Sequence, residues 1–175
     1  MITTDIVSIQ KEYFHSGCTR SLKFRLDALH KISSWVKEHE QAILEALKAD
    51  LNKSETEGYL TEIGVLNEEI RYLSKNLHRW MRNRRARTPL MLIPAKSFRV
   101  CDPYGVVLIM SPWNYPFLLS IDPLVGAIAA GNCAVVKPSA YAPQTSLVIS
   151  RMVRECFPPE YITVVEGGRA ENAWL

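Results

Sequence analysis

Residues 105–140 read GVVLIMSPWNYPFLLSIDPLVGAIAAGNCAVVKPSA, and their pattern sets the architecture of the chain. Val106–Met110 is an uninterrupted apolar run, which is typical of a parallel strand covered on both faces. The stretch 116–131 has the length and apolar content of a helix, and 132–139 predicts a second short buried strand. Strand, helix and strand in this order predict a βαβ unit.

The same alternation continues towards the end of the sequence. Pro143 stands where a helix can begin, because the missing N–H of a proline costs nothing in the first turn. That helix is predicted to end before Pro158, and YITVVEGG (161–168) predicts a third strand. The result is a βαβαβ unit, which is half of a doubly wound sheet.

The first half of the chain has helical spacing instead. Apolar residues recur every three or four positions in three stretches, 3–16, 21–51 and 59–80. The middle stretch is predicted to contain two helices. Ser54, with a glutamate three residues later, has the spacing of a capping box for the last stretch, and that helix is predicted to end at Thr88-Pro89.

Between these halves, Phe98 and Val100 predict one further strand. We expect it to form a hairpin with Val106–Met110 through the turn at Asp102–Gly105.

The predicted fold class is therefore α/β. A helical segment over residues 1–95 precedes residues 96–175, which form the first βαβαβ part of a doubly wound, Rossmann-like parallel sheet. Three parallel strands leave open sheet edges, so we expect the chain to be the front part of a longer protein, truncated relative to a complete fold, or one whose missing sheet comes from elsewhere.

Composition is that of an ordinary globular chain. Its 175 residues suffice for one domain with a core, and 47% hydrophobic and 22% charged residues are average shares. No apolar stretch is long enough for a membrane-spanning helix and no signal peptide is recognised, so we expect a cytoplasmic protein. Four cysteines lack metal-site or disulfide spacing, which predicts free thiols and no metal site.

Positive charge is concentrated in RWMRNRRAR, with arginines at Arg79, Arg82, Arg84, Arg85 and Arg87. A solvated helix end is the favoured interpretation. An interface, or a field that steers an anionic ligand, is the next. Nucleic-acid binding is not expected, because few aromatic residues accompany the cluster and no recognised nucleic-acid fold surrounds it.

Two polar residues stand at the carboxyl ends of neighbouring predicted strands, where α/β proteins bind ligands. The amide of Asn114 can donate a hydrogen bond to an oxygen that becomes negative in a transition state, but an Asx turn or a helix cap is the structural alternative. Lys137 can reach hydroxyls or phosphates of a nucleotide, or it can extend to solvent from the strand end. There is no GxGxxG or P-loop sequence.

These residues lead to a family resemblance. PYGVVLIMSPWNYPFLLSIDPLVGAIAAGNCAVVKPSA (103–140) resembles the cofactor-binding core of the aldehyde dehydrogenases, most closely the class 3 group that acts on fatty and aromatic aldehydes. The resemblance extends to SGCTRSLKFRLDALHKISSWVKEHEQAILEALKADLNKSETEGYLTEI (16–63) and to VVEGG (164–168), so it covers nearly the whole chain.

The resemblance implies a role for each matching residue. Asn114 matches the catalytic asparagine whose amide helps to hold the oxyanion, and Lys137 matches the lysine that binds the adenosine ribose. The other implied cofactor-binding positions are Pro112, Trp113, Pro138, Ser139, Gly167 and Gly168. The implied cofactor is NAD or NADP, the implied substrate an aldehyde, and the implied assembly a homodimer.

The sequence departs from the family pattern in two ways. The family usually has a glutamate three residues after the lysine, where it binds the ribose hydroxyls, and here that position is Ala140. The later GS-x-x-G turn, the general-base glutamate and the nucleophilic cysteine have no counterpart, so the catalytic and oligomerisation domains are expected to be absent from this chain.

The leading hypothesis is therefore that the complete protein oxidises an aldehyde to a carboxylic acid with NAD or NADP, and that this chain is its N-terminal portion and inactive alone. The rival hypothesis, from another class, is a non-catalytic remnant or interaction module that keeps the nucleotide-binding fold.

Overall fold

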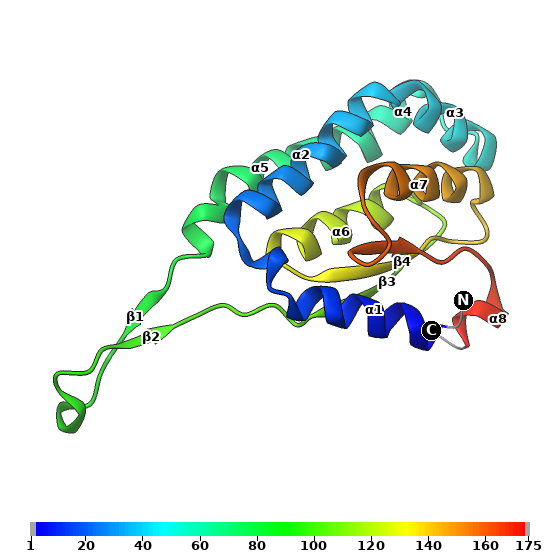
Figure 1. Ribbon diagram of the computed structural model, residues 1–175. Helices are drawn as coiled ribbons and strands as arrows, with labels where there is room; N and C mark the ends of the chain where they lie inside the picture. Colours follow the sequence, from blue (N-terminus) through cyan, green and yellow to red (C-terminus); the bar gives the residue numbers. More distant parts are fainter. Residues whose placement is uncertain (1–2, 174–175) are drawn as a thin grey trace.

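The chain folds into a parallel sheet between helical layers, with a two-stranded arm that projects from one end (Figure 1). The computed structural model describes residues 3–173. Its longer helices are α1 (Thr3–His15), α2 (Leu22–Glu38), α3 (Glu40–Leu51), α5 (Gly64–Trp80), α6 (Leu118–Ala130) and α7 (Pro143–Cys156). The short helical pieces are η1 (Cys18–Arg20), α4 (Glu55–Gly58), η2 (Tyr59–Ile63), η3 (Leu90–Leu92) and α8 (Arg169–Asn172). The strands are β1 (Arg84–Ala86), β2 (Ser97–Arg99), β3 (Val106–Met110), β4 (Cys133–Lys137) and β5 (Ile162–Val164).

The main sheet has the order β3-β4-β5, and both strand pairs are parallel. Val106 is paired with Cys133 at one end of the β3–β4 register, and Met110 with Lys137 at the other. Helix α6 connects β3 to β4, and α7 connects β4 to β5. The prediction of a βαβαβ unit in an α/β, Rossmann-like fold is confirmed.

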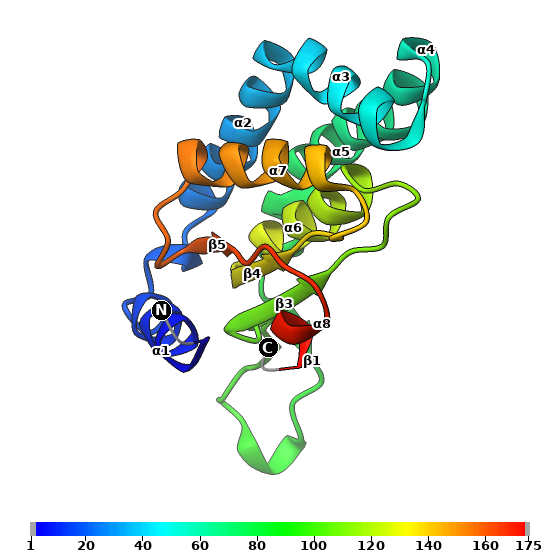
Figure 2. The ribbon, with the colours of Figure 1, turned by 90° about the vertical axis from the view of Figure 1, so that its right-hand side faces the viewer.

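The helices form layers around this sheet (Figures 1 and 2). Right-handed crossovers that step in one direction place their helices on one face, and α6 and α7 both lie there. Helices α2, α3 and α5 pack over α6 and α7 as a further layer, while α1 contacts β3 and β4 from the opposite face. No helix in the described part of the chain is both long and apolar enough to cross a membrane.

Strands β3 and β4 differ in burial. Every residue of β4 is buried, as its apolar sequence predicts. The prediction that β3 is covered on both faces is wrong, because Leu108 is 44% exposed and Met110 is 52% exposed. Within the described residues β3 is an edge strand, and α1 covers only part of its second face.

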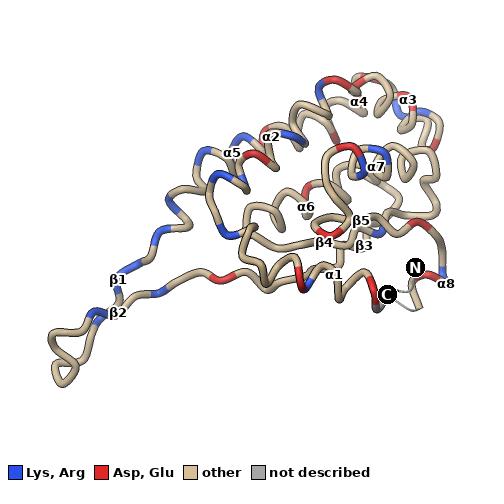
Figure 3. Tube along the Cα trace, viewed as in Figure 1, with Lys and Arg blue, Asp and Glu red and all other residues tan. Residues whose placement is uncertain are grey.

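The arm corrects two sequence predictions. Strand β2 pairs antiparallel with β1, with Arg85 opposite Phe98, so the predicted hairpin between this strand and β3 is wrong. Helix α5 ends at Trp80 rather than near Pro89, and the chain then leaves the body as the arm. The arginine cluster therefore runs from the end of α5 onto β1, and Figure 3 shows basic residues along both strands of the arm.

The helices begin and end where local chemistry predicts. Ser54 Oγ accepts a hydrogen bond from the Glu57 N–H at 3.2 Å, which confirms the predicted cap. Helix α7 begins with Pro143, also as predicted, but no side chain of its own N-cap residue caps it. Asp50 of α3 supplies that cap from a distant part of the chain, because its carboxylate accepts the N–H groups of Gln144 at 3.1 Å and Thr145 at 2.7 Å.

Helix α6 ends at Gly131, which has a φ of 92°. A Cβ atom there would lie 2.4 Å from an Nη atom of Arg25, whose side chain is buried and bonds the Ala129 carbonyl at 3.0 Å. We expect Gly131→Ala to lower the free energy of unfolding by at least about 1 kcal/mol, because the positive φ and the crowding both oppose a side chain.

The matched control is Gly126→Ala in the same helix, where a new Cβ would meet nothing within 4 Å. It should raise stability by about 0.5–1 kcal/mol, because alanine is the better helix former. The measurement is the urea unfolding midpoint of each variant. Equal effects of the two substitutions would contradict this account.

Candidate functional site

The loops that follow β3 and β4 meet at one edge of the sheet and border a cavity. Parallel strands end at a common edge, so residues far apart in sequence come together there. The cavity has a volume of about 450 Å³. Its lining residues are Met110, Ser111, Pro112, Trp113, Lys137, Pro138, Ser139, Ala140, Tyr141, Gly168, Arg169 and Asn172.

The structure brings most of the sequence-predicted cofactor positions to this cavity. Pro112 and Trp113 come from the loop after β3, and Lys137, Pro138 and Ser139 from the end of β4 and the turn after it. Gly168 comes from the start of α8. Gly167 does not line the cavity, but its carbonyl oxygen accepts a hydrogen bond from Lys137, so it supports the wall. Asn114 lies outside the lining.

Sequence reasoning missed Tyr141, Arg169 and Asn172 as lining residues. Tyr141 lies two residues beyond the KPS stretch, and the residue is 77% exposed, so it resembles any surface aromatic. Arg169 and Asn172 belong to the one-turn helix α8, whose place at the cavity depends on the loop after β5. The sequence held one signal for Arg169, which directly follows a glycine pair at the end of a predicted strand.

Lys137 is held rather than extended to solvent. Its residue is 4% exposed, and its Nζ donates to the Gly167 carbonyl at 2.6 Å and to the Pro138 carbonyl at 3.1 Å. The alternative of a lysine that reaches into solvent is therefore wrong. An ammonium group has three N–H donors, so one is left for a ligand in the cavity.

The turn at Gly167 and Gly168 borders the cavity on the side of α8. Gly167 has a φ of 134°, and the Glu171 side chain folds back so that its Oε2 accepts the Gly168 N–H at 2.6 Å. Hydrogen bonds from the backbone N–H groups of Glu171 and Gly168 lower the pKa of the Glu171 carboxyl. The carboxylate is thus engaged within the turn, and the Lys137 ammonium and Arg169 guanidinium are the cationic groups at the cavity.

Asn114 lies in the bend between β3 and α6 with its side chain exposed. Within residues 3–173 its amide group makes no hydrogen bond, and the residue before α6 in the N-cap position is Phe117. Neither an Asx turn nor a helix cap is therefore formed by this side chain. The amide is available to donate to an oxygen outside this part of the chain.

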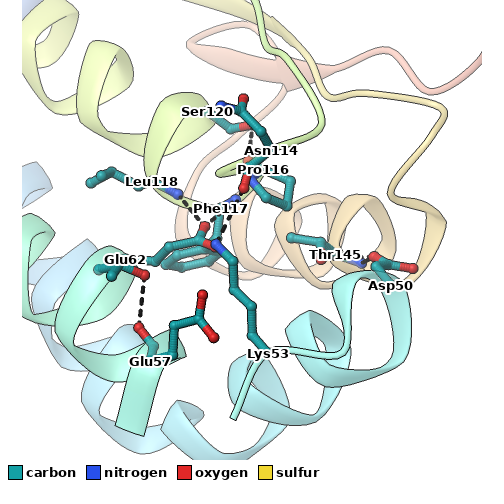
Figure 4. A network of polar contacts seen from close by, with 11 residues as sticks. Asp50, Lys53, Glu57, Glu62, Asn114, Pro116, Phe117, Leu118, Ser120 and Thr145 are labelled. Atoms are coloured by element: carbon teal, nitrogen blue, oxygen red, sulfur yellow. Dashed lines mark hydrogen bonds and ion pairs between the residues drawn. The ribbon is translucent and has the colours of Figure 1, made fainter. Parts of the chain in front are cut away.

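The backbone of this bend is fixed by a buried ion pair that the sequence analysis did not identify (Figure 4). Lys53 Nζ lies 2.6 Å from Glu62 Oε1, with side chains 8% and 0% exposed. The same ammonium donates to the Asn114 carbonyl at 3.2 Å and lies 4.0 Å from the ring centroid of Tyr115. Glu62 Oε2 accepts the N–H groups of Phe117 at 2.9 Å and of Leu118, the first residue of α6, at 3.1 Å.

A second set of bonds closes the other side of the same loop. Ser120 Oγ hydrogen-bonds the Pro116 carbonyl at 2.6 Å and Ser111 Oγ at 2.8 Å. The Ser111 N–H donates to the Lys137 carbonyl at 3.1 Å, which ties the loop to the end of β4. The Asn114 bend and the Lys137 turn are thus parts of one hydrogen-bonded edge.

The cysteines are remote from this site. None of them lines the cavity, and their sulfurs are all free. Burial raises the pKa of the Cys133 thiol to about 12 and that of the Cys156 thiol to about 11. Such thiols are neutral near pH 7 and are poor nucleophiles. Among the described residues no group of three or more His, Cys, Asp or Glu side chains could hold a metal ion.

Sequence comparison with known proteins matches the chain to one protein family. The profile of the aldehyde dehydrogenase family matches residues 4–173. The 4,4'-diaponeurosporen-aldehyde dehydrogenase of Staphylococcus aureus is 45% identical over 94% of this chain, and aldehyde dehydrogenase family 3 member H1 of Arabidopsis thaliana is 40% identical over 98%. In each case the match spans 36% of the relative's length, so the chain covers about a third of these curated relatives.

Solved structures agree with the fold. The structure described as the substrate bound state of Staphylococcus aureus AldH superposes with a TM-score of 0.94 at 43% identity, covering 98% of this chain and 38% of that one. Succinic semialdehyde dehydrogenase from Streptococcus pyogenes, solved in complex with NADP+ as the cofactor, has a TM-score of 0.80 at 16% identity. It covers 98% of this chain and 37% of that one, and at this identity the likeness concerns the fold alone.

The buried thiols lead to a labelling prediction. Iodoacetamide at pH 8 should alkylate the exposed Cys101 rapidly in the folded chain and leave Cys133 and Cys156 unmodified, because both are buried and un-ionised. Peptide mass spectrometry reads out each site, and a urea-unfolded sample, in which all sites should react, is the control. Alkylation of native Cys133 at the rate of Cys101 would overturn the assignment of Cys133 to the core.

Proposed function

The chain belongs to the aldehyde dehydrogenase family, and from this premise we propose that the complete protein oxidises an aldehyde to a carboxylic acid with NAD or NADP. Class 3 members are among its relatives, so fatty or aromatic aldehydes are the proposed substrate class. The observation that carries the proposal is the convergence of Trp113, Lys137 and Gly168, from three separate segments, on one cavity at the carboxyl edge of the parallel sheet.

The residues at the cavity suit a nicotinamide dinucleotide. Lys137 offers a fixed N–H donor, held by two carbonyl oxygens, to the hydroxyls of a ribose. Trp113, which is 55% exposed, offers an aromatic wall, and Arg169 offers a positive charge to a phosphate. When bound, the cofactor supplies the hydride acceptor that the protein itself lacks.

Asn114 is the residue of this chain that we assign to the chemical step. Its amide donates to the aldehyde oxygen as that oxygen becomes negative, which stabilises the transition state more than the ground state. The motifs of the nucleophile and the general base have no counterpart in these residues. We therefore assign to this chain the oxyanion donor and part of the cofactor site, and the remaining groups to the complete protein.

We further propose that the complete protein is a cytoplasmic homodimer, with the arm as a contact surface. The tip of the arm exposes consecutive apolar residues, with Leu90 84%, Met91 96% and Ile93 65% exposed. Exposed apolar surface of this kind marks interaction sites. Four free thiols suit a reducing compartment.

The oxyanion role predicts the effect of Asn114→Ala in the complete enzyme. Loss of one such donor should lower kcat about 10²–10³-fold, while the cofactor Kd stays within about twofold, because the amide acts on the reacting oxygen. The measurements are steady-state kinetics and a cofactor-binding titration. The control is Asn76→Ala on the exposed face of α5, which should leave kcat unchanged. Normal kcat with a raised cofactor Kd would make Asn114 a binding or structural residue.

The cofactor preference depends on Ala140, which lines the cavity where the family usually has a glutamate. A carboxylate there would repel the 2′-phosphate of NADP, and such a like-charge encounter can cost several kcal/mol. With alanine present, Lys137 and Arg169 remain to attract that phosphate. We expect the complete enzyme to use NADP at least as well as NAD, and Ala140→Glu to shift the preference towards NAD.

The measurement is kcat/KM for both cofactors in the native enzyme, in Ala140→Glu and in Ala140→Gln. Glutamine matches glutamate in size but carries no charge, so it should leave the NADP/NAD ratio close to the native value. A native preference for NAD above about tenfold, or about 1.4 kcal/mol, would refute the prediction. So would an unchanged ratio in Ala140→Glu.

A further inference from the structure

We propose that Lys53 and Glu62 are positioning residues for catalysis, which set the place of the Asn114 amide without touching the substrate. This inference rests on the proposed oxyanion role of Asn114. The two residues come from the helical lead-in, on the turn after α3 and in η2, whereas Asn114 lies on the loop between β3 and α6. Figure 4 shows the side chains of the pair meeting beneath that loop.

The contacts of the pair hold Asn114 and the residues that follow it. Before α6, the Lys53 ammonium bonds the carbonyl of Asn114 itself and lies over the ring of the next residue, Tyr115. At the start of α6, the Glu62 carboxylate bonds the N–H groups of Phe117 and Leu118. Because the ion pair joins these two anchors at 2.6 Å, it fixes the backbone from 114 to 118 as one unit.

The side chain of Asn114 has no such anchor of its own. No hydrogen bond holds its amide within residues 3–173, and the residue is exposed. The direction of the amide is therefore governed by the backbone that carries it. An oxyanion donor must be within a few tenths of an ångström of its productive position, so movement of this backbone lowers the rate even when the amide is present.

Stability alone does not account for this arrangement. Removing two charges from water costs several kcal/mol per ion, and a buried pair often gives no net stabilisation over apolar residues of similar volume. The geometry offers a separate reason to keep the pair, since an apolar pair could fill the space but could not bond the Asn114 carbonyl or the two N–H groups of α6.

A double-mutant cycle in the complete enzyme tests the proposal. Lys53→Met keeps the length of the side chain and removes the donor to the Asn114 carbonyl. Glu62→Gln removes the negative charge that binds the Lys53 ammonium and the two N–H groups at the start of α6. Each should lower kcat about tenfold, equivalent to about 1.4 kcal/mol, and leave the cofactor Kd within about twofold. In an Asn114→Ala background the same substitutions should change kcat less than about twofold, because the group they position is gone.

Asp50→Asn is the matched control. Asp50 also caps a helix across the chain, by accepting N–H groups at the start of α7, but within residues 3–173 it makes no hydrogen bond to the Asn114 loop. It should lower the melting temperature and leave kcat within about twofold of the native value. Lys53→Arg retains the charge and should keep more activity than Lys53→Met; if the methionine variant does not fold, Glu62→Gln carries the cycle.

The outcomes test the positioning role and the oxyanion role separately. Native kcat in Lys53→Met, or the same fold-loss with and without Asn114, overturns the positioning role and leaves the oxyanion assignment intact. Native kcat in Asn114→Ala overturns the oxyanion assignment, and the positioning role with it. A loss that depends on the presence of Asn114 supports both.

Discussion

Two carboxylates from the helical lead-in hold the start of both helices on one face of the sheet, and the Asn114 loop depends on one of them, Glu62. Neither α6 nor α7 has a capping side chain at its own N-cap position. Glu62 caps α6 and Asp50 caps α7, each through two backbone N–H groups. A negative charge at a helix N-terminus is favourable, because the helix dipole is positive there. The loop that carries Asn114 is thus positioned by Glu62, which lies far away in the sequence.

The cap on α6 also bears on the route of the proposed cofactor. In many Rossmann folds a dinucleotide phosphate occupies the N-terminus of the helix after the first strand of the nucleotide-binding unit. Here the Glu62 carboxylate already binds the N–H groups of Phe117 and Leu118, so a phosphate would meet a like charge with no donor left in those two groups. The sequence also lacks the GxGxxG motif that forms such a phosphate site. The cationic residues at the cavity are instead Lys137, at the end of β4, and Arg169, at the start of α8, and this is the part of the cavity suited to anionic cofactor groups.

Local sequence patterns predicted what depends on local chemistry. The periodic helices, the Ser54 cap, the Pro143 start and the buried strand β4 follow from spacing and residue type, and Lys137 was found because a charge ends an apolar strand. Strand pairing could not be predicted in the same way. Phe98 pairs with an arginine-rich stretch whose sequence is typical of a helix end. The apolar sequence of β3 is typical of a fully buried strand, because the sequence does not show which neighbours cover it. Glu62 left a usable signal, since it precedes Leu66 and Ile70 at four-residue spacing on the buried stripe. A charge on such a stripe calls for a partner, but only the fold identifies that partner as Lys53.

The buried pair gives a physical reason why a helical segment precedes the sheet in this fold. A strand-end loop can be shaped by its own prolines and by local bonds such as those of Ser120, but such bonds fix it only relative to its own helix. Lys53 and Glu62 lie on a separate layer that packs against α6, so they fix the loop relative to the body of the molecule. The position of Asn114 therefore depends on how this layer packs against α6 rather than on the flexibility of the loop itself. Precision of that kind is what an oxyanion donor requires, and it needs a rigid second layer.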